Sequence, residues 1–199
     1  KAKLVALIDD NFTQADIDQH FANMRASNVQ IEGNLVLENF ASDAMCIDGE
    51  HVYVNGVIAR NNAGAGFIVN GHHNMLVKVG AITNKRHGIE LRGDNNKLTS
   101  GYDAKYHTVL PSVVMGNSWD GVWVNGWGNT IEATYAIANK RTGIHLIGNS
   151  AHHLVTESVA YANQENAGGK GIELASGANH GIVAPSGISI ETTEKGVKI

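Results

Sequence analysis

The chain has 199 residues and a formal net charge of −4, and 43% of its residues are hydrophobic. Glycine occupies 23 positions but proline only 2, whereas a disordered glycine-rich linker would normally also be rich in proline and serine. No apolar run approaches the ~20 residues of a membrane-spanning helix, and 15 basic against 19 acidic side chains exclude an electrostatic footprint for nucleic acid. The single cysteine, Cys46, excludes an internal disulfide framework and a CxxC metal site.

Residues 1–43 differ in pattern from the rest of the chain. Residues 3–8 predict a short strand, and residues 13–27 carry three apolar side chains at helical spacing after a run of good N-cap residues. Residues 29–40 return to strand-like alternation. We expect a small amphipathic helix here that covers the open end of the first coil and hides its edge amides.

From residue 44 onward one short pattern recurs, namely glycine, apolar, variable, apolar, variable, and then usually glycine again. Its copies begin at residues 44, 66, 88, 121, 143, 171 and 196, the first of them with alanine in place of glycine. The basic spacing is 22 residues, lengthened by insertions of 11, 6 and 3 residues. A fixed period of this length is typical of a solenoid.

Asparagine follows the same period, in two sets. One set lies four residues before the repeat glycine and the other eight residues after it: Asn62, Asn84, Asn117 and Asn139, then Asn74, Asn96, Asn129 and Asn179. Glycine and asparagine tolerate positive φ, which tight turns need, and stacked asparagines can bond to one another. The apolar stretches at 75–79, 131–138 and 154–162 alternate with a period of two and predict strands.

Three short strands in each 22-residue coil, each paired with its equivalent in the next coil, make a single-stranded parallel β-helix. A propeller blade needs ~40 residues, and the leucine-rich repeat signature is not found. We therefore expect an all-β fold in one continuous domain, with a strand, a capping helix and the first coil in residues 1–43 and β-helix repeats in residues 44–199. Because the chain starts without methionine and stops inside a repeat, at 196–199, we expect it to be a fragment of a longer chain.

The segments DDNFTQADIDQHF, NKRHGIELRGDNN and ANKRTGIHLIGNS resemble the first helix and the generic coil of the pectate-lyase-like superfamily of parallel β-helices. That superfamily includes phage tailspikes, pectinases and mannuronan epimerases. The resemblance implies a right-handed β-helix that binds long carbohydrates along its outer face, and for phage members a homotrimer on the virion surface. The D-P-H-E signature of the epimerases and the RTX calcium nonapeptides are not found.

On the strand after each repeat glycine, the second and fourth positions point outward. One outward column holds Glu90, Trp123, His145 and Glu173, with Arg92 beside it. Aromatic faces pack on the apolar side of sugar rings, and charged groups bond hydroxyls or uronate carboxylates. The column therefore predicts a sugar-binding surface; the alternative is an ordinary solvated sheet face.

All three tryptophans, Trp119, Trp123 and Trp127, lie around one coil. They are either a platform for a ligand or the cover of an oligomer interface, and the residues leave both open. The 11-residue insertion at about 101–111 precedes that coil and carries Asp103 and Tyr106. We expect it to form a lip of the sugar site, because long loops on rigid scaffolds often carry function, although solenoids also tolerate insertions as ornament.

A glycoside hydrolase needs two carboxylates ~5–9.5 Å apart. Glu90 and Glu173 stand three coils apart, about 14 Å at strand spacing, which is too far to act as a pair. Glu90 and Asp120 are therefore the expected acid/base pair. A polysaccharide lyase would instead use a base such as His145, with Arg92 to neutralise the uronate.

Two pairs of neighbouring histidines, His72–His73 and His152–His153, fall at different offsets in their coils. They are expected to be exposed turn residues rather than metal ligands. No metal and no cofactor is predicted.

We expect the chain to bind and cleave an extracellular polysaccharide, such as a capsule, an O-antigen or a uronate polymer, in the manner of a tailspike depolymerase. The alternative is a non-enzymatic structural or adhesive β-helix, such as a shaft or a receptor-binding element. The expected partners are the polysaccharide and further copies of the chain in a trimer, with neither nucleic acid nor membrane insertion. The expected location is extracellular or on a virion surface.

Overall fold

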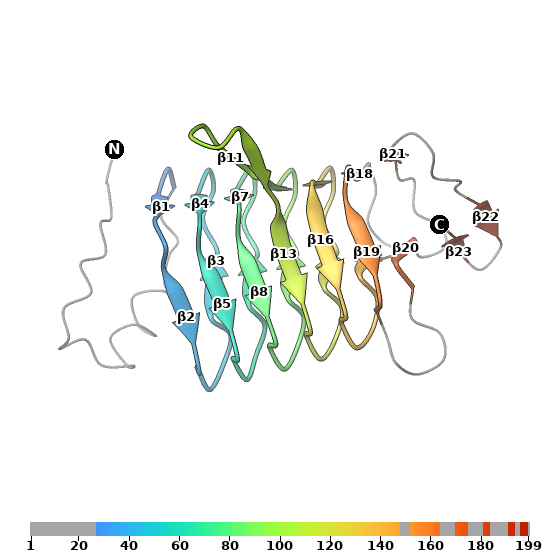
Figure 1. Cartoon of the computed structure of the whole chain (residues 1–199), viewed down its shortest axis with the longest axis horizontal. Helices are drawn as coiled ribbons and strands as arrows, with labels where there is room; N and C mark the ends of the chain where they lie inside the picture. Colours follow the sequence, from blue (N-terminus) through green and yellow to red (C-terminus); the bar gives the residue numbers. More distant parts are fainter. Residues whose placement is uncertain are drawn as a thin grey trace.

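The structure, a computed structural model, describes residues 27–147, 152–163 and 170–174, together with the backbone of three short strands between 181 and 198. This part of the chain is an all-β parallel solenoid of about 22 residues per coil and contains no helix (Figure 1). The expected first strand and capping helix lie outside the described residues. A search of the described residues for a helix long and apolar enough to cross a membrane finds none.

Three parallel sheets run along the solenoid, and we call them A, B and C. Sheet A consists of β1 (Gln30–Glu32), β4 (Tyr53–Asn55), β7 (Met75–Val77), β10 (Lys97–Thr99), β15 (Thr130–Glu132), β18 (Leu154–Thr156) and β21 (Gly181–Val183). Sheet B consists of β2 (Val36–Glu38), β5 (Ile58–Arg60), β8 (Gly80–Ile82), β13 (Ser112–Met115), β16 (Thr134–Ile137) and β19 (Val159–Tyr161). Sheet C consists of β3 (Met45–Ile47), β6 (Phe67–Val69), β9 (Ile89–Leu91), β14 (Val122–Val124), β17 (Ile144–Leu146) and β20 (Ile172–Leu174).

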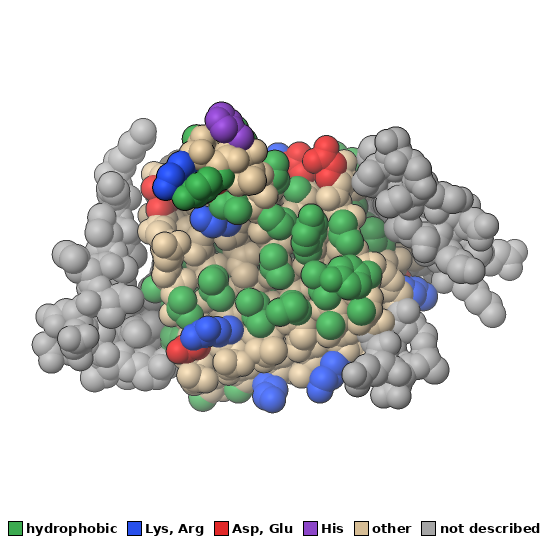
Figure 2. All heavy atoms as spheres, in the orientation of Figure 1, with side chains coloured by type: hydrophobic (Ala, Val, Ile, Leu, Met, Phe, Trp, Pro, Cys, Tyr) green, Lys and Arg blue, Asp and Glu red, His purple; other side chains and the backbone are tan. Residues whose placement is uncertain are grey.

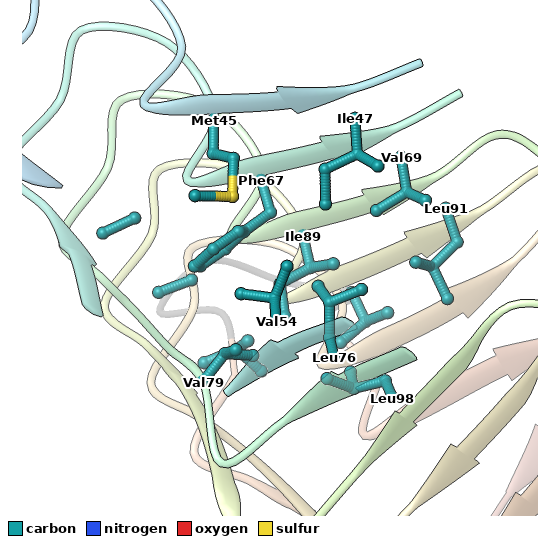
Figure 3. Packing of buried hydrophobic residues seen from close by; sticks show 14 of the residues in the cluster. Met45, Ile47, Val54, Phe67, Val69, Leu76, Val79, Ile89, Leu91 and Leu98 are labelled. Carbon is teal, nitrogen blue, oxygen red and sulfur yellow. The ribbon is translucent and has the colours of Figure 1, made fainter. Parts of the chain in front are cut away.

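Each strand pairs in register with its equivalent one coil away, which confirms the predicted period. Ile47 pairs with Val69, and Val69 pairs with Leu91. These side chains point into the solenoid and are fully buried, and Figure 3 shows them aligned on successive strands. Apolar residues alternate with outward ones because successive side chains of a strand point to opposite faces of the sheet.

The two asparagine sets form hydrogen-bonded ladders inside two of the three corners. At the corner between sheets B and C, Asn62 Nδ2 donates to Asn84 Oδ1 (2.9 Å) and Asn84 Nδ2 donates to Asn117 Oδ1 (3.1 Å), and the series continues through Asn139 to Asn163. At the corner between sheets C and A, Oδ1 of each described asparagine accepts a backbone N–H of the preceding coil, as seen for Asn74, Asn96 and Asn129. Because these asparagines are buried, their side chains supply partners that water would otherwise provide.

His153 takes the place of an asparagine at the end of the second ladder. Its Nδ1 accepts the backbone N–H of Asn129 at 3.1 Å, and the residue is 1% exposed. The expectation of an exposed turn histidine is therefore wrong for His153, while its neighbour His152 is exposed. An imidazole nitrogen can replace the amide oxygen because both accept a hydrogen bond in the plane of the group.

The repeat glycines are needed for close approach rather than for positive φ. A Cβ on Gly66 would lie 2.6 Å from the carbonyl oxygen of Gly88, and one on Gly121 would lie 2.6 Å from that of Gly143. Most positive-φ residues of the described corners are not glycine; His73 (φ 56°) and Lys78 (φ 52°) are examples. Positive φ, the reason expected from the sequence for the glycine excess, therefore applies to only a few of the described glycines.

Two segments depart from the regular coil. The 11-residue insertion forms an antiparallel hairpin of β11 (Gly101–Asp103) and β12 (Thr108–Leu110), which projects at the corner between β10 of sheet A and β13 of sheet B (Figure 1). The last copy of the repeat forms β23 (Gly196–Lys198), which pairs antiparallel with β22 (Glu191–Thr193) and lies beside β20 of sheet C.

Candidate functional site

The outer face of sheet C carries the predicted column in register. Glu90 pairs with Trp123, Trp123 with His145, and His145 with Glu173 on adjacent strands. The column is not an ordinary solvated face, since Glu90 is only 1% exposed although it points away from the core. Its carboxylate is covered by side chains that stand on the same face.

Glu90 lies between two arginines. Arg92 donates to Glu90 Oε2 through Nε (2.9 Å) and Nη2 (2.5 Å), and Arg86 Nη2 lies 3.6 Å from Oε1. Glu90 Oε1 and Arg86 Nε are buried without a hydrogen-bond partner in the structure. This pair of unused polar atoms beside a charged cluster is unusual, because buried polar atoms are nearly always bonded.

Asp120 is buried at the start of the next coil and is fixed by two hydrogen bonds. Its Oδ1 accepts the backbone N–H of Thr142 at 2.9 Å, and its Oδ2 lies 3.3 Å from Nδ1 of His145. Burial alone would raise the pKa of Asp120, but the bonds from His145 and Thr142 outweigh it and hold this pKa below its ordinary value. Asp120 is therefore a carboxylate and not a proton donor near neutral pH.

His145 is oriented by this contact with Asp120. Since a carboxylate only accepts hydrogen bonds, Nδ1 of His145 is the donor in this contact, and in a neutral imidazole Nε2 then has the free electron pair. The side chain is 18% exposed, so the imidazole is reachable from outside the sheet. An imidazole held by a buried carboxylate is an arrangement suited to a general base.

His87 packs between Asp120 and two of the tryptophans. Its Nδ1 accepts the backbone N–H of Asp120 at 3.2 Å, and burial lowers its pKa to about 4, partly offset by the charge of Asp120. The imidazole is therefore neutral at pH 7, and its approach to Asp120 Oδ2 at 3.4 Å is not an ion pair. Its ring packs edge-on against Trp119 (5.0 Å between centroids) and stacks on Trp123 (5.7 Å).

The three tryptophans do not form one platform. Trp119 and Trp123 meet around His87, and the guanidinium of Arg86 lies 5.0 Å from the Trp119 ring centroid. Trp127 stands at the corner between sheets C and A, where it packs against His152 at 5.7 Å and is 54% exposed. The structure thus brings Trp119 and Trp123 to the column, while Trp127 occupies a separate corner.

Glu173 ends the described part of the column and is also held as an anion. It accepts hydrogen bonds from Lys170 Nζ (2.5 Å) and Thr142 Oγ1 (3.0 Å). Burial acts to raise its pKa, but these two bonds and the nearby His145 lower it overall. Lys170 and Thr142 precede their repeat glycines, as His87 and Asp120 do.

Asp103 and Tyr106 lie on the hairpin at the corner between sheets A and B, which is the one corner that sheet C does not reach. Asp103 Oδ1 accepts the backbone N–H groups of Lys105 (2.9 Å) and Tyr106 (3.3 Å), so it shapes the hairpin turn. The expected lip is not formed over the sheet C column, because the insertion leaves the coil before sheet B and not before sheet C.

Sequence reasoning missed Arg86, His87 and Thr142. Aligning the residue immediately before each repeat glycine would have found two of them, because this position forms a second outward row. That row is Asp43, Ala65, His87, Asp120, Thr142 and Lys170. Arg86 has no such signal, since its role depends on the side chain folding over Trp119.

Within the described residues, no group of three or more histidine, cysteine, aspartate or glutamate side chains is placed to hold a metal ion. Comparison of the chain with models of protein families, with curated proteins and with solved structures gives no match.

Proposed function

We propose that this protein is a right-handed β-helix of the pectate-lyase-like type that binds an extracellular polysaccharide along the outer face of sheet C and cleaves it. The observation that carries the proposal is the contact of the Asp120–His145 pair with the aromatic cluster of His87, Trp119 and Trp123. A general base beside aromatic ring faces is what a sugar-cleaving surface requires. The setting would be extracellular or the surface of a virion.

The charges of the site favour an anionic polymer. Arg86, Arg92 and Arg141 stand around the buried carboxylates with side chains 38%, 39% and 55% exposed. Guanidinium groups bind carboxylates through paired N–H donors, as a uronate would need. A polymer laid along the coils would meet equivalent outward positions every ~4.8 Å.

The state of the carboxylates argues against the acid/base pair first expected from Glu90 and Asp120. Hydrolysis needs a carboxylic acid that holds its proton near neutral pH. The pKa of Asp120 is lowered, and Glu90 accepts two hydrogen bonds from Arg92. We therefore propose β-elimination, with His145 as the base and Asp120 as its positioning residue.

In this step Nε2 of His145 removes the proton on C5 of a uronate residue. The electron pair forms a C4=C5 double bond while the bond from C4 to the glycosidic oxygen breaks, and that oxygen takes a proton from water. Arg141, whose Nε lies 3.9 Å from Asp120 Oδ1 and whose side chain is 55% exposed, would pair with the uronate carboxylate.

The test is incubation with a panel of uronate-containing capsular and O-antigen polysaccharides. We expect absorbance near 235 nm from the new double bond, lost in His145→Ala while the binding of polymer is retained. Trp123→Ala is expected to weaken binding, with Trp127→Ala as the matched control at the separate corner. New reducing ends without absorbance near 235 nm would show hydrolysis instead of elimination. If no polymer of the panel binds or reacts, the proposal is refuted.

The second candidate is a non-enzymatic structural or adhesive β-helix, and a specific observation favours it. Five outward side chains of sheet B, all apolar or aromatic, are more than a third exposed: Val36, Met115, Tyr135, Val159 and Tyr161. An apolar sheet face suits a shaft or an assembled wall. Binding of polymer without turnover by the assembled protein would favour this function.

A further inference from the structure

The outer face of sheet B is apolar over most of its described length. Figure 2 shows hydrophobic side chains spread across this face, which fronts the view of Figure 1. The strand pairing arranges them in two outward columns. The first column is Val36, Ile58, Gly80, Val113, Tyr135 and Val159, and the second is Glu38, Arg60, Ile82, Met115, Ile137 and Tyr161.

Charge on this face is limited to one neutralised pair. Arg60 Nε bonds to Glu38 Oε2 across the first two strands, and the four strands after them carry no charged outward residue in these columns. A sheet face in contact with water normally carries mostly polar side chains, which alternate along each strand with the apolar side chains of the buried face. A long face without them marks an interaction surface.

The hairpin β11–β12 adds to this surface at its A–B edge. Tyr102, Tyr106 and Val109 are 63%, 64% and 61% exposed. Together with the exposed side chains of sheet B, and at ~200 Å² for each aromatic side chain, they present roughly 700 Å². This is close to the ~800 Å² that each partner contributes to a stable interface.

We propose that this face is the interface between two copies of the chain, packed sheet against sheet. The rows of this face repeat at the strand spacing of ~4.8 Å, and a second copy has the same spacing by construction. Its side chains can therefore fit between the rows at every coil, which a partner of another fold could match at only a few points. The inference does not depend on the polysaccharide proposal.

The sizes of the outward residues favour two solenoids with antiparallel axes. In that arrangement β8 faces β13, so that Gly80 lies opposite a bulky strand that carries Val113 and Met115. β5 likewise faces β16, and the first strand, β2, faces the last, β19, where the hydroxyl of Tyr161 can reach Glu38. Parallel axes would instead place each strand against its own copy, so that β8 with Gly80 would face β8 and leave a gap there.

Solution mass of the full chain by light scattering tests the proposal, and a dimer is expected. Tyr135→Asp should raise the dimer dissociation constant at least ~30-fold, as loss of a central aromatic contact does, while Trp127→Asp, at an exposed aromatic residue away from this face, leaves it unchanged. Circular dichroism of both variants verifies that each is folded. A monomer, a trimer, or a dimer that persists in folded Tyr135→Asp protein would overturn the proposal.

Cysteine pairs in a Cys46→Ser background test the orientation. A mixture of chains carrying Ile82→Cys with chains carrying Met115→Cys should form a disulfide between copies, because β8 of one copy faces β13 of the other; the two cysteines are kept on separate chains because Ile82 and Met115 pair within one chain. Tyr161→Cys alone should not, since the two end strands stand far apart when the axes are antiparallel. A ready Tyr161→Cys disulfide would show parallel axes and overturn this arrangement.

Discussion

Asp120 Oδ2 lies 3.3 Å from Nδ1 of His145, one coil further along sheet C. Asp120 is also held by the backbone N–H of Thr142 and is almost completely buried. The residue therefore keeps its charge and determines which nitrogen of His145 carries the proton. This contact joins two adjacent coils and fixes the orientation of the His145 imidazole on the outer face of sheet C.

Replacing Asp120 with asparagine should reduce turnover of a cleaved polysaccharide by ~10²–10⁴-fold. The neutral amide preserves the shape but no longer holds His145 with Nε2 free. Affinity for the polymer should change little, and the pH profile of turnover should shift. Initial rates across pH and direct binding measurements give both quantities. Glu173→Gln serves as the matched loss of a carboxylate at the end of the column; if both variants lose activity equally, the specific role of Asp120 is disproved.

The neutral, buried His87 predicts that acid weakens the fold. Burial lowers its pKa to about 4 from 6.5, so between these values the unfolded chain binds a proton that the folded chain does not. The free energy of unfolding should therefore fall as pH falls from 6.5 towards 4, by up to about 1.4 kcal/mol per pH unit from this residue. Above pH 6.5 His87 contributes no pH dependence.

Urea unfolding at several pH values measures this slope. His87→Asn is the control, because asparagine can still accept the backbone N–H of Asp120 but does not titrate. The variant should show a shallower slope in the same window. Equal slopes for the two proteins would mean that His87 is not the group responsible.

Asn84→Ala should destabilise the protein by about 3 kcal/mol or more. The asparagine accepts from both the backbone and the side chain of Asn62, and it donates to Ala59 O and Asn117 Oδ1. Its removal leaves several buried polar groups without partners, each at a cost of about 1–3 kcal/mol. Chemical unfolding measures the change.

Asn125→Ala is the matched control for the ladder. Asn125 is an asparagine of another copy of the repeat that points outward and is exposed. Its replacement should therefore change the free energy of unfolding by less than about 0.5 kcal/mol. Comparable losses in the two variants would show that the ladder bonds are not what makes Asn84 important.

Cys46 should react slowly with thiol reagents in the folded protein. Burial and the charge of Asp48 raise the pKa of its thiol to about 11 from 9.0. At pH 8 the thiolate fraction is then about 100-fold lower than for an unperturbed thiol, and the rate of disulfide exchange falls with it. The rate is measured by following the absorbance released from a chromogenic disulfide, and Asp48→Asn should accelerate the reaction. A folded protein that reacts as fast as the unfolded one would contradict this assignment.

The repeat period, the strand positions between the ladders and the outward column of sheet C were all predictable from the chain. A parallel in-register solenoid converts sequence spacing directly into neighbours in space, so that Glu90, Trp123 and His145 had to be adjacent. The asparagine ladder at Asn62, Asn84, Asn117 and Asn139 was predictable for the same reason. The function of glycine was not, because close approach to the next coil depends on the path of the backbone and not on the local turn.

The sequence by itself therefore determined the solenoid, its period and which side chains share a column. Only the tertiary structure decided that Glu90 is buried beneath its neighbours, that Asp120 bonds to His145, and that Asp103 and Tyr106 stand at the corner away from sheet C. Columns are set by backbone pairing, which repeats with the sequence. Contacts between different columns depend instead on side-chain rotamers and on the corner at which an insertion leaves the coil, and neither of these is encoded in the repeat.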